Sequence, residues 1–549
     1  MTLDGFLTVL GLAAAVYAVV PAVPRLRAGL ALVIQGPVAV LAVTLALYFE
    51  FFSLLSRPCA LPWSSVCAAI TLQPQGLQPT QIAFLVVLIW LPLAWIIHKL
   101  ARPGPGTLPA IGRLVDEMIY EQRFAELITF IEPYLPFIAA AAGRDLPLQR
   151  LSDQCARWRR GPSTRAEWPK PPFLDALEPE TAPQPLGWRR FLPLVGHLGA
   201  WLPSQARAED AASDIVRALL NDPGLRKFTV EMRPYFGLPL MKLSAGRPDD
   251  FAEQFLTDLI AHRGSALYRE LEQNQNLSGL RRYHIPERNR LLTFLLTDAR
   301  MAERLSAYRP IGEHTLKMLR PGQDITYLQR LNHKPERFDD ECWQDPVWAA
   351  LFFFDIMIKE AAFQDIAWHM WLYYVPLIVD GLVANHDETG EGVDPSDEHP
   401  TIGTFLIYRA FDMVGSWVAL IEDLPATSVH RLVPTGRDQN GNIPQSAAIA
   451  LGRCLATVLL SDRVGGSFKT YLMTVVARDV KGLPKASPIR EALIRSIFSG
   501  GIDFSKTSYA PRLRTAFGAI DFLLRSDVED LAAAIAAAKD RPRAGRHTT

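Results

Sequence analysis

Three apolar runs occupy the first hundred residues, the second of them interrupted by Gln35 and Pro37. The first, 6–23, holds 18 residues without a charged side chain; the second, 28–49, holds 22, and the third, 82–97, holds 16. A helix needs about 20 residues to cross a hydrocarbon core of about 30 Å, and flanking side chains that reach the interface compensate for a small shortfall. We therefore predict that residues 1–100 form a membrane anchor with three transmembrane helices.

Positive charge between these runs predicts their orientation, because short cytoplasmic loops carry an excess of lysine and arginine. The tail before the first run has neither residue type, and the loop 51–81 has Arg57 alone. The other connections are basic, with Arg25 and Arg27 after the first run and Lys99, Arg102, Arg113 and Arg123 after the third. The pattern predicts an N-terminus outside and the bulk of the chain in the cytoplasm. The Ala/Leu/Arg-rich composition is typical of a bacterial protein, so the membrane would be a bacterial inner membrane.

The positions of the cysteines fit the same topology. Cys59 and Cys67 both lie in the predicted outer loop, where an oxidising compartment would allow a disulfide that stabilises the loop by about 2–3 kcal/mol. Two unpaired thiols are an equally good interpretation. Cys155, Cys342 and Cys454 have no C-x-x-C spacing and are typical of ordinary thiols in a reducing compartment.

Beyond the anchor, apolar residues recur at helical spacing. Phe251, Phe255, Leu259 and Ile260 follow Pro248-Asp-Asp, which is typical of a helix N-terminus. Strand-like alternation is scarce; its best case, 471–480, fits a helix equally well. The predicted fold class is mainly α, with N-terminal transmembrane helices followed by a large helical cytoplasmic domain.

Composition divides the cytoplasmic part into segments. We predict a juxtamembrane helical region over 101–160 and a Pro-rich linker over 161–190, which contains seven prolines. A helical domain of one or two subdomains would cover 191–540, and 541–549 would form a basic tail. The chain is long enough beyond residue 100 to bury a large core.

Two later stretches, 347–383 and 402–421, are unusually apolar for soluble helices. The first is rich in aromatic residues, but its longest uncharged piece, 366–379, is short for a membrane span, and the second is interrupted by Arg409 and Asp412. Both are predicted to be central core helices. A hydrophobic docking groove or an interfacial segment is the alternative for the aromatic stretch.

Charge and composition exclude several classes of protein. The chain has 57 basic and 57 acidic residues, so no basic surplus indicates nucleic-acid binding. A hydrophobic content of 49% excludes a disordered or low-complexity chain.

The strong catalytic and metal-binding motifs are missing from the sequence. Gly465-Gly-Ser-Phe-Lys-Thr470 contains the residue types of a phosphate-binding loop but not the spacing. There is no H-E-x-x-H, no G-x-S-x-G, and no paired cysteine or histidine spacing for zinc. We therefore predict no metal site, and no particular cofactor is implied.

The segment 386–399 is nevertheless rich in histidine and carboxylate side chains. Such residues could hold a divalent ion, but Thr389-Gly-Glu-Gly and Pro395-Ser mark the segment as a turn. A solvated acidic loop is the favoured interpretation, because unpaired carboxylates normally lie in water.

Residues 262–290 carry the most suggestive polar chemistry. Arginine forks beside aromatic rings can bind phosphate, a nucleotide or a carboxylate-rich partner. The candidate ligand- or partner-binding residues are Arg281, Arg282, Tyr283, His284, Arg288 and Arg290. The alternative is a polar connector between two helices whose charges are merely exposed.

Two functions follow from these patterns. The favoured one is a membrane-anchored, non-catalytic component of a bacterial envelope assembly of the secretion, conjugation or defence type, whose helical domain binds protein partners. The alternative is an enzyme or ligand sensor of an unfamiliar helical type, with its site at 262–290. The expected partners are the lipid bilayer and other proteins of a membrane complex.

Overall fold

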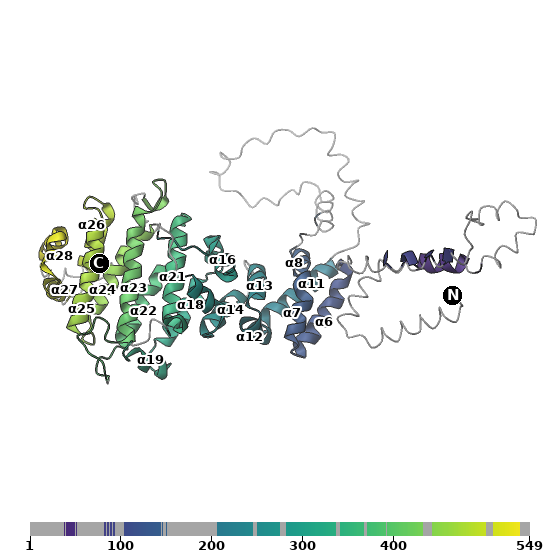
Figure 1. Cartoon of the computed structure of the whole chain (residues 1–549), viewed down its shortest axis with the longest axis horizontal. Helices are drawn as coiled ribbons and strands as arrows, with labels where there is room; N and C mark the ends of the chain where they lie inside the picture. The colour runs from purple at the N-terminus through teal and green to yellow at the C-terminus, as the bar shows by residue number, and fades with distance from the viewer. Residues whose placement is uncertain are drawn as a thin grey trace, which may run out of the picture. The chain divides into compact units, whose positions relative to one another are not determined.

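The computed structural model describes residues 38, 40–49, 51, 82–83, 85–86, 88–90, 92–93, 104–143, 145, 150, 206–244, 250–274, 281–335, 341–366, 371–390, 392–431, 442–500 and 509–537. The described residues are mainly helical and include no strand, so the predicted mainly α class is confirmed. The chain forms two compact units, residues 1–225 and 226–549 (Figure 1).

Parts of two predicted membrane spans lie among the described residues. Residues Val40–Phe49 form an apolar helix within the run 28–49, and the described residues of 82–93 are helical too. Large apolar side chains on both segments are exposed, including Val40 at 67% and Ile89 at 60%. The run 6–23, the linker 161–190 and the tail 541–549 lie outside the described residues.

Beyond residue 103, the described residues of the first unit form four α-helices and two short 3-10 helices. In chain order they are η2 (Pro105–Thr107), α6 (Leu108–Tyr120), α7 (Phe124–Ile131), η3 (Glu132–Tyr134), α8 (Leu135–Ala142) and α11 (Ala206–Asn221). Apolar residues of α6 recur every three or four positions, so one face of this helix is buried. That face packs with α11, which also packs against α8.

The second unit is a longer succession of helices. Helix α12 (Pro223–Met232) crosses the boundary between the two units. The helices that follow are η6 (Pro234–Phe236), α13 (Gly237–Ser244), α14 (Phe251–Ala261), α15 (Ala266–Gln273), α16 (Arg290–Leu296), α17 (Ala299–Arg304), α18 (Tyr308–Met318), α19 (Ile325–Leu331), η7 (Cys342–Gln344), α21 (Pro346–Phe363), η8 (Trp371–Tyr373), α22 (Tyr374–Ala384), α23 (Ile402–Ala419), η9 (Leu420–Glu422), η10 (Val429–Arg431), α24 (Ile443–Leu460), α25 (Gly466–Gly482), α26 (Pro488–Ser499), α27 (Tyr509–Gly518), α28 (Phe522–Asp527) and α29 (Glu529–Ala537).

Helices α21, α23 and α24 form the centre of this unit. Every residue of α21 except the last, Phe363, is buried, and its N-terminal amides of Val347 and Trp348 donate to the Asp345 carboxylate at 2.9 and 3.0 Å. Helix α23 packs against α21, α22, α24 and α25, and α24 packs against α22 and α26. Burial of most of their described residues confirms the core assignment for 347–366, 371–383 and 402–421.

Three helical stretches among the described residues are long and apolar enough to cross a membrane: Phe124–Ala142, Ile402–Glu422 and Ile443–Leu460. Protein covers 61% and 67% of the apolar windows of the second and third, but only 39% of the first. Other parts of the protein therefore cover most of the apolar windows of α23 and α24.

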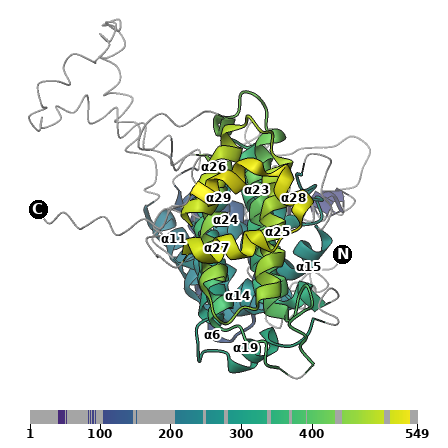
Figure 2. The same ribbon diagram turned by 90° about the vertical axis from the view of Figure 1, so that its left-hand side faces the viewer.

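The last three helices cover the end of the second unit. Helix α27 packs against α24 and α25, α28 against α25, and α29 against α26 and α27, and Figure 2 shows them in front of the longer helices. The buried guanidinium of Arg490 on α26 joins these parts, because it donates to the carbonyls of Val480 and Leu483 and to the Asp530 carboxylate. Residues 471–480 lie in α25, so their strand alternative was wrong.

Candidate functional site

The arginine-rich segment selected from the sequence connects α15 to α16 and contacts α21. Arg282 donates to both carboxylate oxygens of Glu360, at 2.9 and 2.7 Å, and its guanidinium lies 5.4 Å from the centre of the Phe363 ring. The Glu360 side chain is almost fully buried. A two-pronged arginine–carboxylate contact of this kind positions the segment firmly on α21.

Tyr283 extends the contact into the core through Asp355. The Asp355 carboxylate accepts from the Tyr283 hydroxyl at 2.5 Å, from Lys359 Nζ at 3.0 Å and from Trp417 Nε1 at 2.8 Å. Burial and then the nearby negative charge of Asp355 raise the pKa of Tyr283 above its usual value, so the hydroxyl stays a donor. Lys359 balances the buried carboxylate and also faces the Tyr283 ring at 4.9 Å.

Two further candidate arginines also make contacts within the protein. Arg281, in a left-handed backbone conformation with φ of 54°, donates to the Ala419 carbonyl at 2.9 Å and lies 3.3 Å from Asp423. Arg290 stacks over the Tyr235 ring at 4.8 Å. His284 and Arg288 are exposed. Four of the six candidates thus make contacts within the protein, although Arg281, Arg282 and Arg290 are also exposed.

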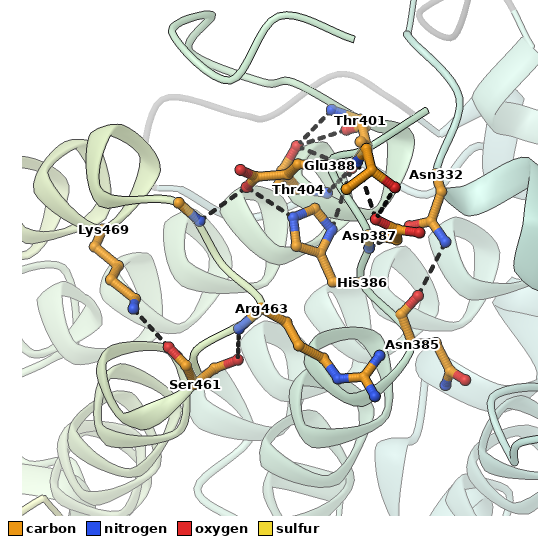
Figure 3. Close-up of polar contacts among 12 residues, drawn as sticks. Asn332, Asn385, His386, Asp387, Glu388, Thr401, Thr404, Ser461, Arg463 and Lys469 are labelled. Atoms are coloured by element: carbon orange, nitrogen blue, oxygen red, sulfur yellow. Dashed lines mark hydrogen bonds and ion pairs between the residues drawn. The ribbon is translucent and has the colours of Figure 1, made fainter. Parts of the chain in front are cut away.

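A second polar centre lies in the loop after α22, which the sequence suggested to be simply solvated. Asp387 and Asp394 are indeed exposed and accept hydrogen bonds from Thr389 and Ser396. His386 instead is buried, with its Nε2–H donating to Glu388 Oε1 at 2.9 Å (Figure 3). The described residues contain no group of three or more histidine, cysteine or acidic side chains that could hold a metal ion.

The carboxylate of Glu388 ties this loop to the start of α25. Its Oε1 also accepts from the Gly465 amide at 2.9 Å, at the N-cap of that helix. A negative charge at a helix N-terminus is favourable because the helix dipole is positive there. We name the set His386, Glu388, Thr401 and Gly465 the α23–α25 clip.

Thr401 completes the clip at the N-terminus of α23. Its hydroxyl accepts from the Thr404 amide at 3.2 Å, and the Thr404 hydroxyl accepts from the Thr401 amide at 2.9 Å, which forms a capping box. His386 Nδ1 lies 3.5 Å from the Thr401 hydroxyl. Hydroxyl, imidazole and carboxylate follow the order of a nucleophilic triad, but this hydroxyl is fully buried and occupied by capping, so the arrangement fastens helix ends.

Two asparagine side chains, Asn332 and Asn385, connect the clip to other segments of the chain. Asn332 Nδ2 donates to the Asn385 carbonyl at 3.0 Å, and Asn332 Oδ1 accepts from the Asp387 amide at 3.0 Å. Asn385 Nδ2 donates to the Leu319 carbonyl at 2.8 Å, at the end of α18. These long-range partners explain why the sequence could not reveal that His386 is buried.

Lys469, from the incomplete phosphate-loop sequence, lies near the clip but contacts α24. Its Nζ donates to the Ser461 carbonyl at 2.5 Å, and Arg512 donates to the Leu460 carbonyl at 2.7 Å. Burial, followed by repulsion from Arg512, lowers the pKa of Lys469. Both cations bind carbonyl groups at the C-terminus of α24, where positive charge is favourable.

Comparisons with protein families, with curated proteins and with solved structures found no match to this chain. The class that the fold and site define is a mainly helical protein whose polar centres join helix ends.

Proposed function

We propose that this protein is a membrane-anchored, non-catalytic component of a bacterial envelope assembly, whose helical domain binds protein partners. The observation that carries the anchor is the exposure of large apolar side chains on Val40–Phe49 and on the described residues of 82–93. Contiguous apolar surface is unfavourable in water and favourable against hydrocarbon. Thr44 also satisfies its hydroxyl within its own helix, by donating to the Val40 carbonyl at 2.7 Å, as a lipid-facing helix requires.

The partner-binding role is supported by an exposed apolar pair at the end of the second unit. Phe522 and Leu523 are neighbours in sequence on α28, and they are 71% and 72% exposed. The use of Arg281 and Arg282 in internal contacts also favours this role over an arginine-lined ligand site. A secretion, conjugation or defence apparatus would use such a component.

Crosslinking of the full chain in native membranes, followed by purification in detergent, tests the proposal. We expect a stoichiometric protein complex that the double variant Phe522→Asp/Leu523→Asp weakens. Because both side chains are exposed, this variant should keep its helical content, as measured by circular dichroism. Release of the wild-type chain from membranes by carbonate at high pH would contradict the anchor.

The ligand-sensor alternative is tested on the exposed pair of candidates. His284→Ala/Arg288→Ala removes two exposed candidate side chains without disturbing the contacts of Arg282. A copurified small molecule that disappears from this variant, but persists in the matched surface variant Arg300→Ala, would favour the sensor. An intact protein complex in both variants supports the scaffold.

A further inference from the structure

Asp479 lies where α25 crosses α23, in a notch left by a glycine. Gly415 on α23 is buried, and a methyl group added there would overlap the Asp479 carboxylate. The carboxylate therefore occupies the space that a side chain of α23 would otherwise fill. Gly415 allows the close approach because it has no Cβ.

The position of this carboxylate is unfavourable for a charge. Asp479 as a residue is half-buried, but its Oδ2 is fully buried and has no hydrogen-bond donor among the residues that the structure describes. Burying a carboxylate without a donor or counter-charge is costly, whereas the neutral acid is tolerated much better. The Asp355 carboxylate, in contrast, accepts hydrogen bonds from three donors.

The charges nearby do not compensate Asp479. Asp412 on α23 is the charged group that acts on it, and Arg409 is already bound to Asp412 at 2.7 Å. Arg478, beside Asp479 on α25, is exposed. The charged groups on the other helices packed against α25 and at its end have partners or ring contacts of their own: Arg453 with Asp380, Lys481 with Asp527, Arg490 with Asp530, Arg495 with Glu491, Arg512 with Asp462, Arg525 with the Phe522 ring, and Arg514 with a further contact.

We propose that Asp479 is a proton-operated latch between α23 and α25. In the protonated form the neutral carboxyl group packs in the Gly415 notch and the two helices stay in contact. Loss of the proton leaves a negative charge beside Asp412 whose buried oxygen, Oδ2, has no donor among the described residues, and α25 loosens from α23. The clip still holds the first turn of α25 through Gly465, so the loosening affects the middle and the end of the helix.

The direction of the pH effect follows from burial and from the like charge of Asp412, which raise the pKa of Asp479 from 3.8 to about 7. The folded protein therefore holds a proton that the unfolded chain has already released between these two values. Stability falls as the pH rises through this window, and the loss is complete above about pH 7.

Hydrogen–deuterium exchange of the full chain in detergent micelles, at pH 6 and pH 8.5, measures the latch. After correction for the intrinsic exchange rate, we expect the protection of amides in residues 474–482 to fall about tenfold at the higher pH, since pH 6 lies about one unit below the pKa of about 7. Equal protection at both pH values would overturn the proposal.

Three variants identify the titrating group. Asp479→Asn, which resembles the neutral acid, should keep α25 protected at pH 8.5. Asp412→Asn should move the midpoint of the transition to lower pH, and this test still applies if the first variant fails to fold. Asp527→Asn, a matched control in the exposed ion pair with Lys481, should leave the midpoint unchanged. An unaltered pH dependence in Asp479→Asn, or an unshifted midpoint in Asp412→Asn, would refute the latch.

Discussion

At the residue scale, the protein contains two kinds of buried carboxylate. Asp355 is surrounded by Tyr283, Lys359 and Trp417, which provide three hydrogen bonds and one positive charge. The buried oxygen of Asp479 has no donor in the part of the chain that the structure describes. A complete set of donors makes a buried charge part of the structural framework, whereas an incomplete set makes it sensitive to pH.

We expect Lys359→Met to be strongly destabilising. The substitution leaves the Asp355 carboxylate buried without a counter-charge, which costs about 3–5 kcal/mol in the free energy of unfolding. Urea denaturation in detergent measures the change. Arg495→Met, which removes an exposed ion pair with Glu491, should cost about 0.5 kcal/mol or less. A similar loss in both variants would mean that the buried Asp355 network contributes no more to the free energy of unfolding than an exposed ion pair.

The sequence was least informative about the contacts of individual residues. It selected Arg281, Arg282, Tyr283 and Arg290 as polar residues with potential for binding, but it could not show their partners. Glu360 is 78 positions from Arg282, and no local pattern connects them. His386 shows the same difficulty, because turn-forming neighbours suggested solvent while Thr401 and Glu388 bury it.

At the level of helices, close approaches between backbones determine the packing. A methyl group added at Gly452 on α24 would overlap the Ser496 carbonyl of α26. The side chain of any larger residue would force the two helices apart, so glycine permits the contact.

Gly452→Ala should therefore reduce the melting temperature, with a loss of about 1–3 kcal/mol from overpacking. Gly466→Ala on α25 is the matched control, because nothing lies within 4 Å of its added methyl group. The control should be neutral or stabilising by up to about 1 kcal/mol, since alanine favours helix. Differential scanning calorimetry of both variants distinguishes packing from helix propensity; equal effects would argue against the close contact.

The clip makes a second prediction about helices. Glu388→Ala removes the acceptor for His386 and Gly465, so amides of residues 386–400 and of the first turn of α25 should exchange about tenfold faster, corresponding to about 1.4 kcal/mol. Asp394→Ala, on the exposed part of the same loop, should accelerate exchange only around Ser396. Unchanged exchange at the start of α25 in Glu388→Ala would show that the clip does not hold this helix.

Helices were predicted better than individual contacts. The residues Phe251, Phe255, Leu259 and Ile260 are all buried in α14, as their spacing indicated. Asp250 occupies the expected N-cap, but its side chain makes no capping hydrogen bond. Periodicity depends on the chain alone, whereas capping and register depend on neighbours from distant segments.

At the scale of the whole molecule, the predicted topology places the apolar segments in a bilayer and the helical units in the cytoplasm. The Cys59 and Cys67 pair lies outside the described residues and offers a direct test. Cys342 and Cys454 are buried in the second unit and form no disulfide among the described residues, so they serve as internal references.

An impermeant maleimide added to intact spheroplasts should label Cys59 or Cys67 after mild reduction. Cys342 and Cys454 should react only after permeabilisation and unfolding, because burial protects both and raises the pKa of Cys454. Mass spectrometry of the labelled peptides gives the readout. Labelling of Cys59 or Cys67 that requires permeabilisation would reverse the predicted orientation.

Arg490 has a practical consequence for shortened chains. Its guanidinium binds two carbonyls near the end of α25, and among the described residues Asp530 supplies its negative charge. In a chain truncated before α29, the buried guanidinium would lose its Asp530 partner. The apolar residues that pack against Leu531 and Ile535 would also become exposed. Reporter fusions should therefore be joined after residue 537, and insolubility of earlier fusions would reflect a damaged end of the molecule rather than its membrane attachment.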